Sequence, residues 1–230
     1  MDPIYPVGTR FPLLLYSIHT AEEMAEVEEA GWSVGHRYRF TEEFFDVIEK
    51  AGWLCVAHLE GKTKVEKAAT VAAPKAKKGA DAANQEEAGG TAHAVAPTER
   101  LRTEEEVAAD IRAYAAHDAL AWWDFPEEQR WWYKDEYQIV KSLSAWTRKY
   151  DPRERPNYMY LPGHYTTKSI LKYLEYLDIV GAGTYTEYSH QPRAWVRWRT
   201  EETIRAITTG GFRIGPDYLN GEKTPIGIPM

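Results

Sequence analysis

The feature that most constrains the fold is a repeated junction between helix and strand. The residues Glu29-Ala30-Gly31-Trp32 recur 21 residues later as Lys50-Ala51-Gly52-Trp53. Each copy ends a helical pattern with glycine, which suits the left-handed position just past a helix, and then opens an apolar run with tryptophan. A chain that alternates strands with helices of about ten residues pairs its strands in parallel through right-handed crossovers.

Threonines followed by glutamates mark where the helices begin. Thr20 with Glu23 and Thr103 with Glu106 have the spacing of a capping box, and Thr41 precedes acidic residues that favour a helix N-terminus. We therefore predict an α/β fold, a (β/α)8 TIM-barrel-like domain that is incomplete, with about seven strands and six helices. The predicted strands are Phe11–Ser17, Trp32–Tyr38, Trp53–Glu60, Ala119–Asp124, Asn157–His164, Asp178–Tyr185 and Thr224–Met230, and the predicted helices occupy about 21–30, 42–50, 103–116, 134–149, 167–176 and 200–208.

Residues 1–230 would form a single barrel-like domain, and an open doubly wound sheet is the structural alternative. No Gly-x-Gly-x-x-Gly follows the first strand, which removes the best-known reason to prefer the open sheet. Residues 62–98 do not fit the alternation, because they are rich in Ala, Lys, Glu and Gly and contain no aromatic residue. Such a segment cannot bury enough apolar surface to offset its ordering entropy, so we predict a mobile insertion loop after the third strand.

Charge and composition exclude several classes of protein. The 28 Lys and Arg against 35 Asp and Glu give a net charge of −7, which argues against nucleic acid or an anionic membrane as the main partner. A single cysteine, Cys55, leaves no intrachain disulfide and no cysteine-based metal cage. No apolar stretch approaches the ~20 residues of a membrane span. No signal peptide is visible either, so a cytoplasmic protein and a secreted one with its signal removed both remain open.

Side chains that ionise or form hydrogen bonds stand at six successive strand ends. Barrel enzymes carry their reactive groups there, where each strand runs into the following loop. The chain is also rich in aromatic residues, with 9 Trp, 15 Tyr and 6 Phe, whose rings stack on the apolar faces of sugars as well as filling cores. The strand-end residues are His19, Tyr38, Arg39, His58, Glu60, Asp124, Glu127, Glu128, His164, Tyr165, Glu187, Tyr188 and His190.

The densest of these positions is Trp122–Glu128, at the end of the fourth predicted strand. Carboxyl groups beside tryptophan rings are in an environment that raises a carboxyl pKa, and glycoside hydrolysis needs two carboxyls across the scissile bond. We therefore predict Glu127, Glu128 and Glu187 as catalytic, although Glu127 and Glu128 would also suit the start of a helix. Predicted substrate-binding residues are Trp123, Asp124, His58, Glu60, His164, Tyr165, Tyr185, Tyr188 and His190.

Several stretches of the chain resemble the barrel domain of clan-A-type, β-galactosidase-like glycoside hydrolases. The similarity spans almost the whole chain except 62–98, and the stretches that carry it are Phe11–Tyr16, Ala30–Trp32, Ala51–Trp53, His117–Trp123, Lys149–Pro156 and Asp178–Gly181. The resemblance implies a general acid in an Asp-Glu-Pro or Asn-Glu pair after strand 4 and a nucleophile at the end of strand 7. Here Asp124-Phe125-Pro126 stands in place of Asp-Glu-Pro, so Glu127 or Glu128 would supply the acid. The chain given ends at Met230, inside the seventh strand.

Three functions therefore remain open. The favoured one is a glycoside hydrolase-like protein that acts on an oligo- or polysaccharide by carboxylate acid/base chemistry, with no cofactor and no metal. A non-catalytic carbohydrate-binding barrel remnant would keep the aromatic groove and lack the acid–nucleophile pair. A metal-dependent hydrolase or isomerase could use His58, Glu60, His164, Glu187 and His190, although no His-x-His or His-Glu-x-x-His motif is present.

The expected barrel also predicts an oligomer. A sheet that lacks its eighth strand exposes two edges of unpaired backbone groups, and such edges invite pairing with a second copy. We therefore expect a homo-oligomer.

Overall fold

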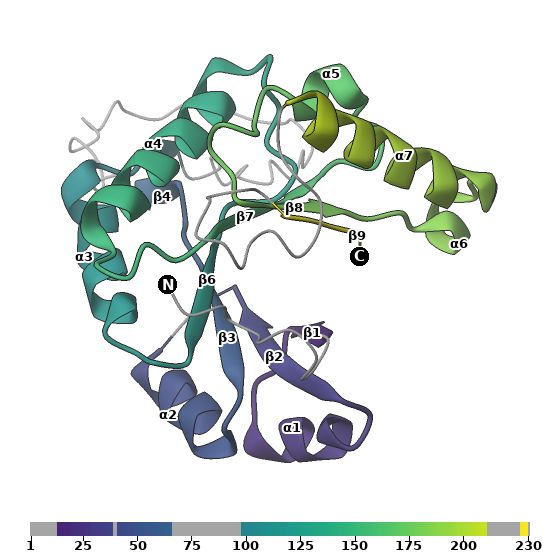
Figure 1. Cartoon of the computed structure of the whole chain (residues 1–230). Helices are drawn as coiled ribbons and strands as arrows, with labels where there is room; N and C mark the ends of the chain where they lie inside the picture. The colour runs from purple at the N-terminus through teal and green to yellow at the C-terminus, as the bar shows by residue number, and fades with distance from the viewer. Residues whose placement is uncertain (1–12, 39–40, 66–97, 211–225, 230) are drawn as a thin grey trace, which may run out of the picture.

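A computed structural model describes residues 13–38, 41–65, 98–210 and 226–229 (Figure 1). Seven parallel strands form one sheet, in the order β1-β2-β3-β6-β7-β8-β9. The order along the sheet follows the order along the chain, so every crossover steps in the same direction, as in a barrel. A doubly wound sheet would reverse direction at one point. The strands are β1 Leu13–Tyr16, β2 Trp32–Arg37, β3 Leu54–His58, β6 Leu120–Asp124, β7 Asn157–Leu161, β8 Ile179–Ala182 and β9 Ile226–Pro229.

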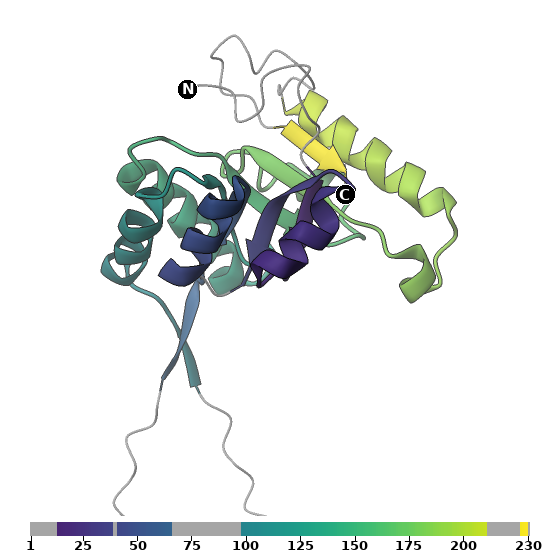
Figure 2. The same cartoon turned by 90° about the horizontal axis from the view of Figure 1, so that it is seen from below.

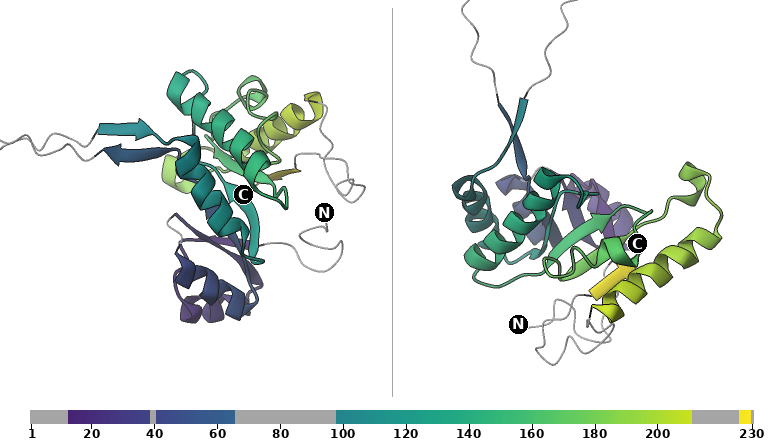
Figure 3. Two further views of the ribbon diagram at one scale, coloured as in Figure 1. Left: turned by 90° about the vertical axis from the view of Figure 1, so that its left-hand side faces the viewer. Right: turned by 90° about the horizontal axis from the view of Figure 1, so that it is seen from above.

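The sheet curls into a half-barrel, with helices along the outside of the curl (Figures 1 and 3). The predicted parallel α/β fold is therefore confirmed, and the doubly wound alternative is excluded by the strand order. Closure into an eight-stranded TIM barrel stays a proposal. The helices are α1 Ala21–Glu28, α2 Glu42–Ala51, α3 Glu104–Ala115, α4 Lys134–Tyr150, α5 Thr167–Ile170, α6 Thr186–Ser189 and α7 Ala194–Thr209. Among the described residues, no helix combines the length and apolar character required to cross a membrane.

The predicted helix ends have the expected chemistry. Thr20 and Thr103 both form complete capping boxes with the glutamate three residues later. Thr41 accepts a hydrogen bond from the backbone N–H of Phe44 at the start of α2. Gly52 ends α2 with φ of 69°, the left-handed conformation that glycine adopts without strain.

Two helix boundaries differ from the prediction. Helix α7 begins at Ala194 and not near residue 200, because Pro192 opens its first turn by accepting a hydrogen bond from the backbone N–H of Trp195. Residues 194–199, which the prediction placed before this helix, thus form its first turns. Helix α5 has only four residues, and turns occupy the rest of the predicted 167–176.

An antiparallel ribbon interrupts the alternation after β3. Strand β4, Lys62–Val65, pairs with β5, Thr98–Leu101, and the ribbon projects away from the body of the fold (Figure 2). The prediction that residue 62 already belongs to a loop is therefore corrected. The prediction used the composition of the whole segment 62–98, which does not reveal a strand as short as the four residues of β4. Residues 66–97 lie outside the described residues, so their mobility stays a prediction.

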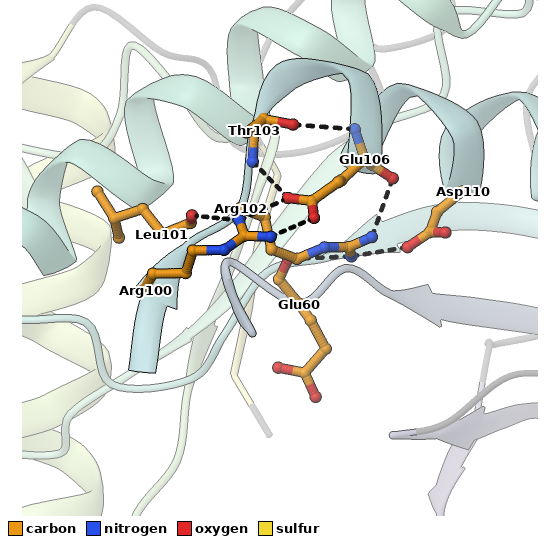
Figure 4. A network of polar contacts seen from close by, with 7 residues as sticks. All are labelled: Glu60, Arg100, Leu101, Arg102, Thr103, Glu106 and Asp110. Atoms are coloured by element: carbon orange, nitrogen blue, oxygen red, sulfur yellow. Dashed lines mark hydrogen bonds and ion pairs between the residues drawn. The ribbon is translucent and has the colours of Figure 1, made fainter. Parts of the chain in front are cut away.

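Arginines fix the base of this ribbon to the rest of the fold. Arg102 donates to Asp110 Oδ2 at 2.7 Å and to the backbone oxygen of Glu106 at 2.9 Å (Figure 4). Arg100 donates to both carboxylate oxygens of Glu106, at 2.8 and 2.5 Å. Because Glu106 also completes the capping box of α3, the ribbon and the start of that helix are held as one unit.

Side chains alternate between the two faces of the sheet and form two apolar layers. The larger layer lies between the sheet and the helices and includes Phe45, Ile48 and Trp123. The smaller layer belongs to the concave face, where Val34, Val56, Trp122, Tyr158 and Ile179 pack together. The residues two positions beyond Val34, Val56 and Trp122 must share that concave face, because the side-chain period of a strand is two. They are His36, His58 and Asp124.

The concave layer leaves no room for a side chain at Gly181 on β8. An added Cβ would lie 2.5 Å from the hydroxyl oxygen of Tyr158 and 2.9 Å from its ring. Overpacking of this kind destabilises a protein by about 1–3 kcal/mol. We therefore expect Gly181→Ala to lower the free energy of unfolding by that amount in urea titrations. Tyr158→Phe should relieve part of the loss in the double variant, whereas strictly additive losses would contradict the clash.

Candidate functional site

A buried cluster of two histidines and one aspartate lies at the carboxyl ends of three neighbouring strands. His36 of β2 donates through Nε2 to Asp124 Oδ2 of β6 at 2.9 Å, and His58 of β3 donates through Nδ1 to the same oxygen at 2.6 Å. His58 and Asp124 are direct partners in the β3–β6 register. All three side chains are buried. Parallel strands therefore bring together three polar groups that are far apart in the sequence.

The two histidines of the cluster stabilise the ionised form of the Asp124 carboxyl group. Burial by itself would raise the pKa of Asp124, but the hydrogen bonds and charges of His36 and His58 outweigh it, so the pKa of Asp124 is lowered. Burial likewise opposes protonation of His58, yet the hydrogen bond and charge of Asp124 prevail and raise the pKa of that imidazole. Two buried atoms of this cluster, Asp124 Oδ1 and His36 Nδ1, have no hydrogen-bond partner in the part of the chain that the structure describes.

Glu127 lies next to this cluster and is joined to it through Tyr38. The Tyr38 hydroxyl donates to Glu127 Oε1 at 3.0 Å. The Tyr38 ring contacts both imidazoles, with centroids 4.7 Å from His36 and 5.5 Å from His58. Burial raises the pKa of the half-buried Glu127, and the charge of Asp124 acts in the same direction, so together they outweigh the opposing Tyr38 hydrogen bond. Glu127 is thus a carboxyl group that holds its proton more tightly than an ordinary glutamate.

Tyrosines surround Glu127 on the concave side. The hydroxyls of Tyr16 and Tyr158 lie 3.1 Å apart, and the Tyr16 ring stands 4.3 Å from His36. Tyr160 and the exposed Tyr185 have ring centroids 6.3 Å apart. Burial raises the pKa of Tyr16, Tyr158 and Tyr160, so these hydroxyls stay neutral. Neutral hydroxyls and ring faces around a carboxyl group are suited to a polyhydroxylated ligand.

Two open clefts lie beside Glu127. One of about 430 Å³ is lined by Glu127, Glu128 and His164 among others, and Glu128 is exposed there. The other, of about 550 Å³, lies at the base of the ribbon and is lined in part by Glu60. Both clefts include Gln129 and Glu136 in their walls, so they adjoin each other.

Two of the predicted substrate-binding residues pack in the interior. Trp123 is fully buried on the helix side of the sheet and donates its indole N–H to Asp151 at 3.0 Å. Tyr165 is also buried, and its hydroxyl donates to the backbone oxygen of Gln129 at 2.9 Å. Both side chains are enclosed in this structure, and their part in substrate binding stays a prediction.

The remaining predicted residues divide by position. His58 and Asp124 belong to the buried cluster and do not reach the surface as binding groups. His190 is exposed at the end of α6 with φ of 54°, and His19 is exposed after β1. The side chains of Glu187 and Tyr188 lie outside what the structure describes, as does Arg39. Of the five residues considered for a metal site in the sequence analysis, only His58 belongs to the buried cluster. The other two members of the cluster are His36 and Asp124.

His36 and the concave tyrosines were absent from the predicted site. A signal for His36 existed, because Val34-Gly35-His36 and Val56-Ala57-His58 share the pattern of valine, a small residue and histidine shortly after the two tryptophans of the junction repeat. That pattern puts a histidine near the carboxyl end of two neighbouring strands. Tyr16, Tyr158 and Tyr160 carry no comparable signal.

Comparison with known proteins relates the chain to glycoside hydrolases through its fold. No protein-family model matches the sequence, and no curated protein matches it. A β-D-glucuronidase from Dictyoglomus thermophilum superposes with a TM-score of 0.51 at 14% identity, over 82% of this chain and 30% of the enzyme. A β-glucuronidase from an uncultured Clostridium sp. gives 0.51 at 13% identity, over 85% and 31%.

A GH2 β-galacturonidase from Eisenbergiella tayi, bound to galacturonate, superposes with a TM-score of 0.51 at 15% identity, over 89% of this chain and 30% of that one. The chain thus spans less than a third of the length of each of these enzymes. At such identities the likeness concerns the fold alone. The chain has a glycoside hydrolase-like fold.

Proposed function

We propose that the chain is a glycoside hydrolase-like protein of clan-A barrel type that acts on an oligo- or polysaccharide, with Glu127 as the general acid. The observation that carries the proposal is the state of Glu127. This carboxyl group is half-buried, has a raised pKa, and stands among tyrosines at the carboxyl edge of a sheet whose neighbours in shape are glycosidases. Barrel enzymes place their acid at this edge.

In the proposed mechanism, protonated Glu127 donates its proton to the glycosidic oxygen as the bond to the leaving group breaks. Tyr38 keeps the Glu127 carboxyl oriented through its hydroxyl. Glu187, in the short helix α6 after β8, is the proposed second carboxylate. A separation of about 5–5.5 Å between the two carboxyls would give retention of configuration, and a larger one would give inversion. Glu128, His164, Tyr185, Tyr188 and His190 are proposed to bind sugar around this pair.

A substrate panel tests this assignment. The wild-type chain should hydrolyse at least one member of a set of aryl glycosides that includes neutral sugars, β-glucuronides and β-galacturonides. For glycosides of weakly acidic phenols, Glu127→Gln should slow that turnover by about 10²–10⁴-fold while retaining binding, because the amide is isosteric but has no proton to transfer. Glu105→Gln is the matched control on an exposed glutamate of α3 that lines neither cleft, and its turnover should equal that of the wild type.

Two outcomes would contradict the catalytic role. Equal turnover of glycosides of weakly acidic phenols by wild type and Glu127→Gln would exclude Glu127 as the acid. Glycan binding by the wild type without any turnover would identify the non-catalytic carbohydrate-binding alternative. The homo-oligomer expected from the open sheet edges stays a prediction.

A further inference from the structure

The buried cluster of His36, His58 and Asp124 offers a function that the proposed hydrolysis does not use. One ligand-type atom from each side chain lies within 4.8 Å of the other two. The three atoms come from β2, β3 and β6, which are neighbours in the sheet, and all three side chains are buried. Because the three side chains come from hydrogen-bonded strands of one sheet, the backbone of the sheet fixes the positions of the three ligand atoms relative to one another.

The donor set selects a class of ion. Two imidazole nitrogens and one carboxylate oxygen suit zinc and related transition metals, whereas calcium and magnesium favour all-oxygen sites. Bonds of about 2.0–2.1 Å at the tetrahedral angle of zinc separate two ligand atoms by about 3.3 Å. Asp124 Oδ2 lies 2.9 Å from His36 Nε2 and 2.6 Å from His58 Nδ1. Outward shifts of about 0.4–0.7 Å would therefore admit an ion in place of the shared protons.

A second observation points to the same place. Asp124 Oδ1 is fully buried and has no hydrogen-bond partner among the described residues. An unsatisfied buried acceptor of this kind costs about 1–3 kcal/mol, and more when the group is charged. Coordination of an ion by one or both Asp124 oxygens would remove that cost.

The surroundings also favour a cation. The carboxylate of Glu60 acts electrostatically on His58, in addition to that of Asp124. The rings of Tyr16 and Tyr38 lie against the imidazole of His36 and limit the access of bulk water. We propose that His36, His58 and Asp124 bind one divalent transition-metal ion, with zinc as the best match, and that the ion holds the ends of β2, β3 and β6 together beside Glu127.

Metal titration of the full chain tests the proposal without any substrate. After treatment with a chelator, the chain should bind one zinc ion per molecule, measured by elemental analysis and calorimetry, and its Tm should rise. Cobalt(II) should give visible absorption bands from nitrogen and oxygen coordination. Asp124→Asn and His58→Gln should each weaken zinc binding by ~100-fold or more, because even outer partners of metal ligands contribute 10–100-fold. His19→Gln, an exposed histidine at the same edge, should bind zinc as the wild type does.

Circular dichroism establishes that each variant is folded before its affinity is compared. No stoichiometric zinc or cobalt binding by the folded wild-type chain would overturn the proposal and leave a hydrogen-bonded trio. Unchanged affinity in a folded Asp124→Asn or His58→Gln chain would overturn it as well. Neither readout depends on glycoside turnover, so the metal site and the proposed hydrolysis succeed or fail separately.

Discussion

Replacement of Glu127 by glutamine is expected to slow hydrolysis in proportion to how poor the leaving group is. A general acid contributes typically 10²–10⁴-fold to rate, so kcat/KM for sugar or alkyl leaving groups should fall by about that factor. Glycosides of acidic phenols should lose far less, because such phenolates depart without a proton. The measurement is kcat/KM for a series of aryl glycosides of graded phenol acidity, compared between wild type and Glu127→Gln.

The pattern of loss separates an acid from a structural residue. A disrupted fold would slow every substrate alike, whereas loss of the acid makes the dependence on phenol acidity steeper. Tyr38→Phe serves as a matched variant, because it keeps the Glu127 carboxyl and removes only the hydroxyl that donates to it. Its losses should be smaller and should vary less with the leaving group. A flat dependence in Glu127→Gln would exclude Glu127 as the proton donor.

The order of elements could be predicted from the sequence because each signal was local. Gly52 at a left-handed helix end and the capping boxes at Thr20 and Thr103 act within a few residues of each other. A helix–strand alternation then leaves parallel pairing as the natural arrangement. The ribbon of β4 and β5 escaped prediction because its two strands meet across a long segment of chain. Strand pairing between residues so far apart in the sequence leaves no pattern within either short segment.

The candidate site was predicted only in part, because strand phase is not visible in an apolar run. Trp122 and Trp123 are adjacent and chemically identical, yet one faces the concave side and the other packs against the helices. The sequence does not distinguish which ring faces the concave side. His36 was missed for the same reason, since its inward orientation follows only once Val34 is known to face the concave layer. Glu127 was predicted because tryptophans and acids are concentrated at that strand end.

The buried ion pair between Asp151 and Arg155 should produce the other large effect, a loss of stability. Asp151 Oδ1 accepts from Arg155 Nη1 at 2.8 Å, and Oδ2 accepts from the indole N–H of Trp123 at 3.0 Å. The Arg155 guanidinium is buried and also donates to the backbone oxygens of Leu120 and His117. These contacts join the end of α4 to the strand β6 that carries Asp124.

Asp151→Asn removes the charge and leaves a buried guanidinium without its counter-ion, so we expect the free energy of unfolding to fall by about 3–5 kcal/mol. Asp118→Asn is the matched control, because Asp118 pairs with Arg153 but its side chain is 84% exposed. That change should lower stability by at most about 1 kcal/mol. Urea unfolding followed by circular dichroism measures both. Equal losses would mean that the Asp151 pair contributes no more than a surface contact. A double variant, Asp151→Asn with Arg155→Met, should recover part of the loss, because it removes the unpaired charge itself.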